Sequence, residues 1–230
     1  MSLYAQHDRL LVAIDCIIFG FEQDRLKLLL IKRDFEPEKG RWSLVGGFAR
    51  NNEGLDAAAV RILNTLTGLQ DVFMEQLYCF NDVDRDPVER TISLAYYALI
   101  NIEDHDEELI KKYGASWFDM DDVPELIFDH GRMVETARER LKYKATHYPV
   151  GFELLPPKFT MPELQSLYEA IFETPIDKRN FIRRITALDI LEKLNEKKKG
   201  KAIKQAFLYQ FDTEKYKELQ KTGNNFLIKP

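Results

Sequence analysis

The segment Gly46–Leu69 constrains the fold most, because it joins a glycine-led loop to a regular amphipathic pattern. Six apolar residues in it recur at helical spacing and form one stripe: Leu55, Ala58, Ala59, Ile62, Leu63 and Leu66. Asn51 or Asn52 is suited to cap the start of this helix, and Gly68 is suited to end it. The segment therefore predicts a loop followed by a helix over residues 55–66 that buries one face.

Strand-like runs lie on both sides of this helix, which indicates an α+β fold. Apolar and β-branched residues dominate the ranges 10–21, 26–31, 72–80, 91–100 and 116–118, and a second helical pattern follows at 132–144. Asp15 interrupts the first strand, where a buried carboxylate is costly unless it has a partner. The structural interpretation of Asp15 is a position at the rim of the strand or a structural hydrogen bond, and the functional one is a group that faces a polar pocket.

A cluster of chain-breaking residues divides the chain. Pro149, Gly151, Pro156 and Pro157 fall within a short stretch, and such a density marks a connector. We therefore predict two domains, residues 1–147 and 148–230. The first carries 18 basic and 27 acidic residues (net −9), and the second carries 15 and 11 (net +4). This asymmetry suggests different partners, with a nucleic acid as one candidate for the basic domain and a solvated charged face as the alternative.

The sequence contains no signal for a membrane or for export. No apolar run reaches the length of a membrane span, and the N-terminus lacks the basic flank and apolar core of a secretion signal. We therefore expect a cytoplasmic protein without a membrane partner. Cys16 and Cys79 lie in apolar runs and are expected as buried thiols, not as a disulfide.

The second domain has the pattern of a winged helix. Thr160-Met161-Pro162-Glu163 is a capping box that begins one helix, and Asp177 is placed to cap a second helix that continues to about Leu188. Two strands are expected after it, at residues 190–194 and 205–211, and a lysine-rich turn over residues 195–201 lies between them. Helix, short turn, helix and two-stranded ribbon is the element order of a winged helix.

The second helix of this domain carries basic residues on the face opposite its apolar one. Phe181 and Ile185 define the apolar face. Arginine reads guanine bidentately, asparagine reads adenine, and lysine suits phosphates, while the second helix of a helix-turn-helix enters the major groove. We therefore predict double-stranded DNA as a partner, bound by the second helix and the turn: Lys178, Arg179, Asn180, Arg183, Arg184, Lys197, Lys198, Lys199 and Lys201.

The spacing of Gly47, Glu53 and Arg61 resembles the opening of the Nudix box, which is Gly, five residues, Glu, seven residues and Arg. The box ends in Gly and an apolar residue, which are Gly68 and Leu69 here. The resemblance implies that the first domain is a Nudix-like α/β/α sandwich with a mixed sheet.

The same comparison reveals a missing metal site. In Nudix hydrolases the box helix carries carboxylates at the positions that Ile62, Thr65 and Leu66 occupy here. Mg²⁺ requires oxygen ligands, so we expect a Nudix fold without the hydrolase site, with no catalytic residue, metal or cofactor. Glu53 is retained, and we favour for it an ion pair with Arg61 that holds the loop against the helix.

Both halves together resemble the Nudix-related transcriptional regulators, typified by NrtR-type and AraR-type repressors. The more distinctive part of this resemblance lies in the phrases Phe159–Glu169 and Ile176–Phe181. In that family a Nudix-like domain senses a metabolite and a winged helix binds operator DNA as a dimer. The resemblance therefore implies a homodimeric, ligand-responsive repressor.

Family members respond either to L-arabinose or to ADP-ribose. Because the box lacks its metal-binding carboxylates, our main hypothesis is a pentose such as L-arabinose and control of carbohydrate metabolism. The alternatives are an ADP-ribose-sensing regulator of NAD metabolism and a residual Nudix hydrolase of ADP-ribose-like substrates. We expect the effector cleft to be lined by Asp15, Lys32, Gly46, Gly47, Phe48, Glu75 and Tyr78. An ion pair between Asp15 and Lys32 across neighbouring strands is the structural alternative.

Overall fold

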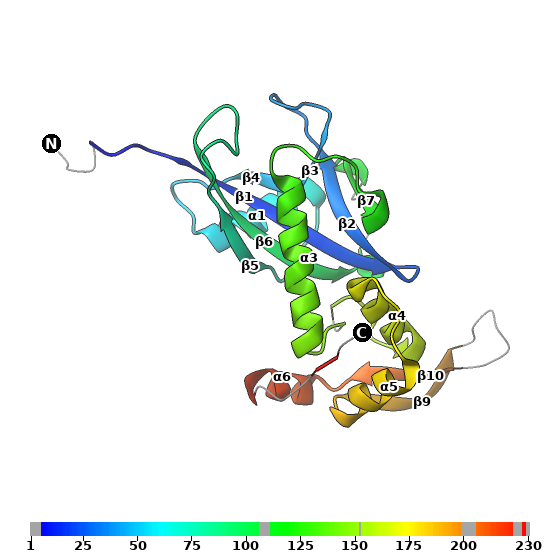
Figure 1. Cartoon of the computed structure of the whole chain (residues 1–230). Coiled ribbons are helices and arrows are strands. Elements are labelled where there is room, and N and C mark those ends of the chain that lie inside the picture. Colours follow the sequence, from blue (N-terminus) through cyan, green and yellow to red (C-terminus); the bar gives the residue numbers. More distant parts are fainter. Residues whose placement is uncertain (1–5, 106–110, 152, 199–205, 223–226, 229–230) are drawn as a thin grey trace. The chain divides into compact units, whose positions relative to one another are not determined.

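The computed structural model describes residues 6–105, 111–151, 153–198, 206–222 and 227–228 (Figure 1). The chain forms two compact units. The first comprises Met1–Phe19, Leu28–Leu99 and Asp106–Ala137, and the second comprises Gly20–Lys27, Ile100–His105 and Arg138–Pro230. Helix α3 (His130–His147) contributes to both units, so their division does not fall at one point of the chain. The domain boundary between residues 147 and 148 stays a prediction.

The described part of the first half contains a seven-stranded sheet. Across it the order is β3 (Trp42–Ser43), β2 (Arg25–Lys32), β1 (Leu11–Glu22), β6 (Thr91–Asn101) and β5 (Glu75–Phe80). In addition, β4 (Val45–Phe48) pairs with β1, and β7 (Ala115–Asp119) pairs with β2. Short 3₁₀ helices span Ile102–Asp104 and Met120–Asp122. Each strand expected from the sequence is present, with ends that differ by a few residues.

The central position of β1 explains its nearly continuous apolar run. Residues from Ala13 to Phe21 are buried, as expected for a strand that is covered on both faces. Cys16 is buried as predicted, and burial raises the pKa of its thiol. The same prediction for Cys79 is wrong. This residue lies on β5 at the end of the strand order, where one face of the strand is exposed.

Helix α1 (Leu55–Thr67) buries four residues of the predicted stripe, Ala58, Ala59, Ile62 and Leu63, whereas Leu55 at the start of the helix is exposed. Gly68 ends the helix in the left-handed conformation (φ 74°), and its N–H donates to the Asn64 carbonyl, as the sequence predicts. The N-cap is Gly54, so the predicted cap at residues 51 and 52 is wrong. Asn51 and Asn52 lie in a turn that ends before the cap position at Gly54.

The second half contains the elements of the predicted winged helix. Their order is β8 (Phe159–Thr160), α4 (Met161–Phe172), α5 (Lys178–Ala187), β9 (Leu191–Lys198), β10 (Ala206–Phe211) and α6 (Thr213–Thr222). The three strands form a small sheet in the order β8-β10-β9. The predicted capping box is present: the Thr160 side chain accepts from the Glu163 N–H, and the Glu163 carboxylate accepts from the Thr160 N–H.

The aromatic core of this half fixes the second helix against the first. Tyr168 of α4 packs edge-on against Phe181 of α5, with ring centroids 5.2 Å apart. The Tyr168 hydroxyl also accepts a hydrogen bond from the Val150 N–H at 2.9 Å. Because Phe181 and Ile185 are buried here, the opposite face of α5 is left exposed. Among the described residues, no helix combines the length and apolarity that a membrane span requires.

Candidate functional site

A cavity of about 350 Å³ lies within the first unit. Five of the seven predicted effector residues line it: Asp15, Lys32, Gly46, Gly47 and Phe48. The other two, Glu75 and Tyr78, are on β5 and are not part of its lining. Tyr78 is largely exposed and packs against Phe80. Strands β1, β2 and β4 therefore bring most of the predicted residues together.

The floor of the cavity is built around Asp15, which is only 5% exposed. In the β1–β4 pairing, Asp15 lies opposite Gly46. A Cβ atom at Gly46 would stand 2.2 Å from Oδ1 of Asp15, so only glycine leaves room for the carboxylate. The Ser93 hydroxyl of β6 donates to Oδ2 of Asp15 at 2.5 Å. Both readings of Asp15 from the sequence therefore apply, since it makes a structural hydrogen bond and also faces a polar pocket.

A buried arginine accompanies this carboxylate. Arg85 comes from the loop between β5 and β6, and its side chain is only 3% exposed. It donates two hydrogen bonds to Asp129, at 2.8 and 3.1 Å, and its guanidinium lies 3.7 Å from Asp15. A buried charge is stable only when it is paired and hydrogen-bonded, which this bidentate geometry provides. The sequence pattern gave no signal for Arg85, because the residue lies in a charged segment between two predicted strands, where exposure is the ordinary expectation.

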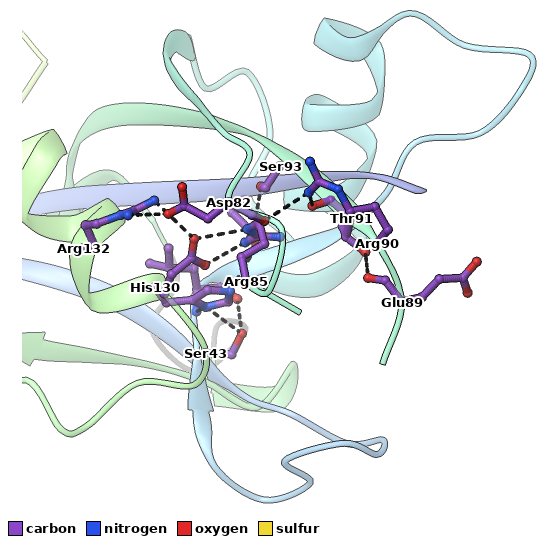
Figure 2. Close-up of polar contacts among 12 residues, drawn as sticks. Ser43, Asp82, Arg85, Glu89, Arg90, Thr91, Ser93, His130 and Arg132 are labelled. Atoms are coloured by element: carbon purple, nitrogen blue, oxygen red, sulfur yellow. Dashed lines mark hydrogen bonds and ion pairs between the residues drawn. The ribbon is translucent and has the colours of Figure 1, made fainter. Parts of the chain in front are cut away.

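His130, the first residue of α3, completes the floor (Figure 2). Its Nδ1 accepts a hydrogen bond from the Leu44 N–H at 3.1 Å and lies 3.4 Å from the Ser43 hydroxyl. Nε2 lies 3.6 Å from Oδ1 of Asp15. Burial lowers the pKa of His130, so the ring is neutral, with its proton on Nε2, directed toward Asp15. Sequence reasoning missed His130 and Arg85, and it also missed other residues of the lining: Arg33, Phe35, Lys112 and Tyr113.

Charged and aromatic side chains form the rim. The Lys32 ammonium lies 5.3 Å from the centre of the Trp42 ring. Asp15 is paired instead with Ser93 and Arg85, so the proposed Asp15–Lys32 ion pair does not form. The Arg33 guanidinium stacks on Phe35 at 3.8 Å. Four aromatic rings contribute to the lining: Phe35, Phe48, Tyr113 and Phe128.

The box helix presents an apolar surface to this region. The Ile62 side chain packs directly beneath Gly47, and Leu66 lines the cavity. Thr65 is exposed. Among the described residues, no group of three or more His, Cys, Asp or Glu side chains is arranged to hold a metal ion.

Glu53 has the structural role that we favoured. Its carboxylate accepts two hydrogen bonds from Arg61, at 2.5 and 2.8 Å, and one from the Arg50 N–H at 2.9 Å. Arg61 also donates to the Phe48 carbonyl at 3.0 Å. The hydrogen bonds from Arg61 lower the pKa of Glu53 to about 2. The pair thus holds the glycine-led loop against the middle of α1.

Helix α5 carries the predicted DNA-binding side chains on its exposed face. Asp177 caps the helix by accepting from the Asn180 N–H at 2.8 Å. Arg183 donates to Oδ1 of Asn180 at 3.0 Å, so these two side chains form one polar group. Arg184 donates instead to the Leu227 carbonyl. Five basic or polar side chains are exposed along the helix: Lys178, Arg179, Asn180, Arg183 and Arg184.

The lysines of the wing differ from the prediction. Lys197 and Lys198 were expected in a turn, but they lie within β9, where they pair with Phe207 and Ala206 of β10. The Lys197 ammonium lies 4.7 Å from the centre of the Phe207 ring, which is a cation–π contact between β9 and β10. Lys198 forms an ion pair with Glu163 at 2.6 Å. The remaining predicted residues, Lys199 and Lys201, lie outside the described residues.

Comparison with known proteins agrees with this architecture. Residues 9–137 match the model of the NUDIX domain, and residues 151–211 match the model of the NrtR DNA-binding winged helix domain. Over 211 residues the chain is 32% identical to the ADPR responsive transcriptional repressor NtrR of Acinetobacter baylyi, covering 90% of this chain and 84% of that protein. The chain belongs to the NrtR family. The predicted fold, a Nudix domain followed by a winged helix, is confirmed.

Two solved structures of the family are similar to this chain. Shewanella oneidensis NrtR complexed with a 27mer DNA is 29% identical, with a TM-score of 0.80 over 90% of this chain and 95% of that one. The NUDIX domain of the same NrtR, complexed with ADP ribose, is also 29% identical, with a TM-score of 0.51 over 61% of this chain and 99% of that one.

These relatives correct one expectation from the sequence. Our main hypothesis of an L-arabinose effector and of carbohydrate metabolism is wrong, because a relative that matches along most of the chain is an ADPR responsive repressor. A solved NUDIX domain of the family also holds ADP ribose. The error came from treating the loss of metal-binding carboxylates as evidence against a phosphorylated effector. Binding a diphosphate requires positive charge, which side chains also supply.

Proposed function

We propose that this protein is a transcriptional repressor that binds operator DNA through its winged helix and responds to ADP-ribose through its Nudix domain. The observation that carries the proposal is the likeness to an ADPR responsive repressor along 90% of the chain. Such a protein acts in the compartment that holds the DNA, which is the cytoplasm of a bacterial cell. Because ADP-ribose is the part of NAD that remains without nicotinamide, we expect the regulated genes to serve NAD metabolism.

The chemistry of the cavity supports an ADP-ribose-like effector. Its volume of about 350 Å³ falls within the range of small-molecule sites. Carboxylates such as Asp34 and Asp86 accept hydrogen bonds from sugar hydroxyls, and the rings of Phe35 and Tyr113 offer flat surfaces for a base. Basic side chains at the rim suit a diphosphate. The cavity therefore offers a suitable group for each part of this ligand.

The exposed basic face of α5 supports DNA binding. Arg179, Asn180 and Arg183 are exposed on the helix that enters the major groove in winged helices. We propose that two copies bind as a homodimer, since a dimer places two such helices on two half-sites of one operator. Light scattering at micromolar concentration should give twice the mass of 27.0 kDa.

Hydrolysis is not part of this proposal. The positions of the box helix that would ligate Mg²⁺ hold Ile62, Thr65 and Leu66, and Glu53 is occupied by Arg61. We therefore expect purified protein to leave ADP-ribose intact in the presence of Mg²⁺. Release of AMP at a rate that depends on protein concentration would instead support the residual hydrolase.

The decisive experiment measures operator binding with and without the effector. An operator selected from random DNA should be bound by the full chain, and ADP-ribose should weaken that binding about 5–150-fold, the usual range of allosteric coupling. L-arabinose at the same concentration serves as the control and should have no effect. Operator affinity that is identical with and without ADP-ribose would overturn the proposal.

A further inference from the structure

The Nudix fold implies a divalent cation at its box helix, and the residues of this chain do not fit one. Of the three positions that carry carboxylates in hydrolases, Ile62 is buried beneath Gly47 and Leu66 contributes an apolar surface to the cavity. Thr65 supplies one neutral hydroxyl, which is a poor ligand for Mg²⁺. Glu53 already accepts hydrogen bonds from Arg61 and Arg50. A diphosphate in this cavity therefore needs another source of positive charge.

Three basic side chains line the same cavity: Lys32, Arg33 and Lys112. Lys32 ends β2, and Arg33 follows it directly. The Lys32 N–H donates to the Gly114 carbonyl at 3.3 Å, which places the segment that carries Lys112 beside the end of β2. Two separate segments therefore bring their basic residues to one part of the rim.

The structure also holds Arg33 in a defined orientation. Its Nε lies 2.5 Å from the Pro37 carbonyl and 3.2 Å from the Phe35 carbonyl, to both of which it donates. The guanidinium stacks on the Phe35 ring and lies 5.5 Å from the Phe128 ring. Such contacts restrict the side chain before a ligand arrives, which lowers the entropic cost of binding.

The remaining charged groups of the cavity are less suited to a diphosphate. Arg85 is committed to Asp129 by two hydrogen bonds, and His130 is neutral. Asp34 and Asp86 would repel a diphosphate placed beside them, whereas ribose hydroxyls can donate to them. This distribution favours the basic rim for the diphosphate and the acidic residues for the sugars.

We propose that Lys32, Arg33 and Lys112 hold the diphosphate of ADP-ribose in place of a divalent cation. The inference rests on the proposed function, since it assigns one part of that ligand to residues of this chain. The protein then binds its effector equally well without metal, although it keeps the fold of a metal-dependent family.

Calorimetric titration of the full chain with ADP-ribose, once with EDTA and once with Mg²⁺, separates the two proposals. We expect the same dissociation constant in both buffers. Binding that requires Mg²⁺ would overturn the metal-free site and leave ADP-ribose sensing intact. Failure to bind ADP-ribose in either buffer would overturn the proposed function itself.

Variants then test the basic rim. Lys112 is exposed, so Lys112→Gln removes a charge without opening the core, and we expect about tenfold weaker ADP-ribose binding, as for the loss of one charge-assisted hydrogen bond. Lys112→Arg should retain most of the affinity. The matched control is Lys39→Gln, an exposed lysine that is not part of the lining. Equal affinities for Lys112→Gln and Lys39→Gln, with unchanged melting temperatures of the free proteins, would overturn the assignment.

Discussion

Nε2 of His130 lies 3.6 Å from Oδ1 of Asp15, at the floor of the cavity in the Nudix domain. The two residues come from the start of α3 and the middle of β1. Ser93 and Arg85 add contacts to the same carboxylate from β6 and from the loop before it. Because its polar groups are paired with one another, this floor keeps its geometry without a ligand.

The neutral state of His130 predicts a dependence of stability on pH. Burial lowers the pKa of this residue from its ordinary 6.5, so the unfolded chain binds the proton at a higher pH than the folded chain does. The contribution of neutral His130 to the free energy of unfolding is therefore complete above about pH 6.5 and is lost as the pH falls below that value. Urea unfolding should show a steeper loss of stability from about pH 7 to about pH 5 in the wild type than in His130→Asn. Parallel profiles would contradict a buried neutral histidine.

The ion pair of Glu53 and Arg61 predicts a second dependence at lower pH. The pKa of Glu53 falls from 4.5 to about 2, so its stabilising effect is present above 4.5 and disappears as the pH falls toward 2. Glu53→Gln should therefore melt at a lower temperature than the wild type at neutral pH, and the difference should shrink under acid conditions. A calorimetric melting series measures both. A difference that is the same at every pH would exclude the ion pair as its cause.

The space around Gly46 predicts the effect of a single methyl group. Gly46→Ala places a Cβ atom against Asp15, so the carboxylate must move away from Ser93, and we expect a loss of about 1–3 kcal/mol in the free energy of unfolding. Gly131→Ala is the matched control, because nothing lies within 4 Å of a Cβ atom at that helical position. It should leave stability unchanged or raise it by up to about 1 kcal/mol. Denaturant midpoints that fall equally in both variants would contradict this account.

The proposed DNA contacts of α5 predict separate roles for charge and geometry at Arg183. Arg183→Ala should weaken binding to a selected operator by about 1–3 kcal/mol if this side chain reads a base. Arg183→Lys keeps the charge but loses the bidentate fork, so it should lose specific binding and retain binding to unrelated DNA. Fluorescence anisotropy with both DNAs tests this. Wild-type operator affinity in Arg183→Ala would remove this residue from the interface.

The wing illustrates how far local sequence reaches. The sequence predicted a lysine-rich turn over residues 195–201 between two strands, but β9 continues through Lys198. Cation–π contacts stabilise the longer strand, since the ammonium groups of Lys193 and Lys197 both lie over the Phe207 ring. An ion pair between Lys198 and Glu163 adds to them. These contacts involve another strand and another helix, so they leave no trace in the local pattern.

The sequence alone determined the features that depend on neighbouring residues. The buried stripe of α1, its end at Gly68 and the capping box of α4 follow from helical periodicity and from hydrogen bonds a few residues long. Only the tertiary structure decided which groups surround Asp15. Arg85 and His130 come from a loop and from a helix start, where no periodicity reports burial, and their charge states depend on partners that only folding brings together.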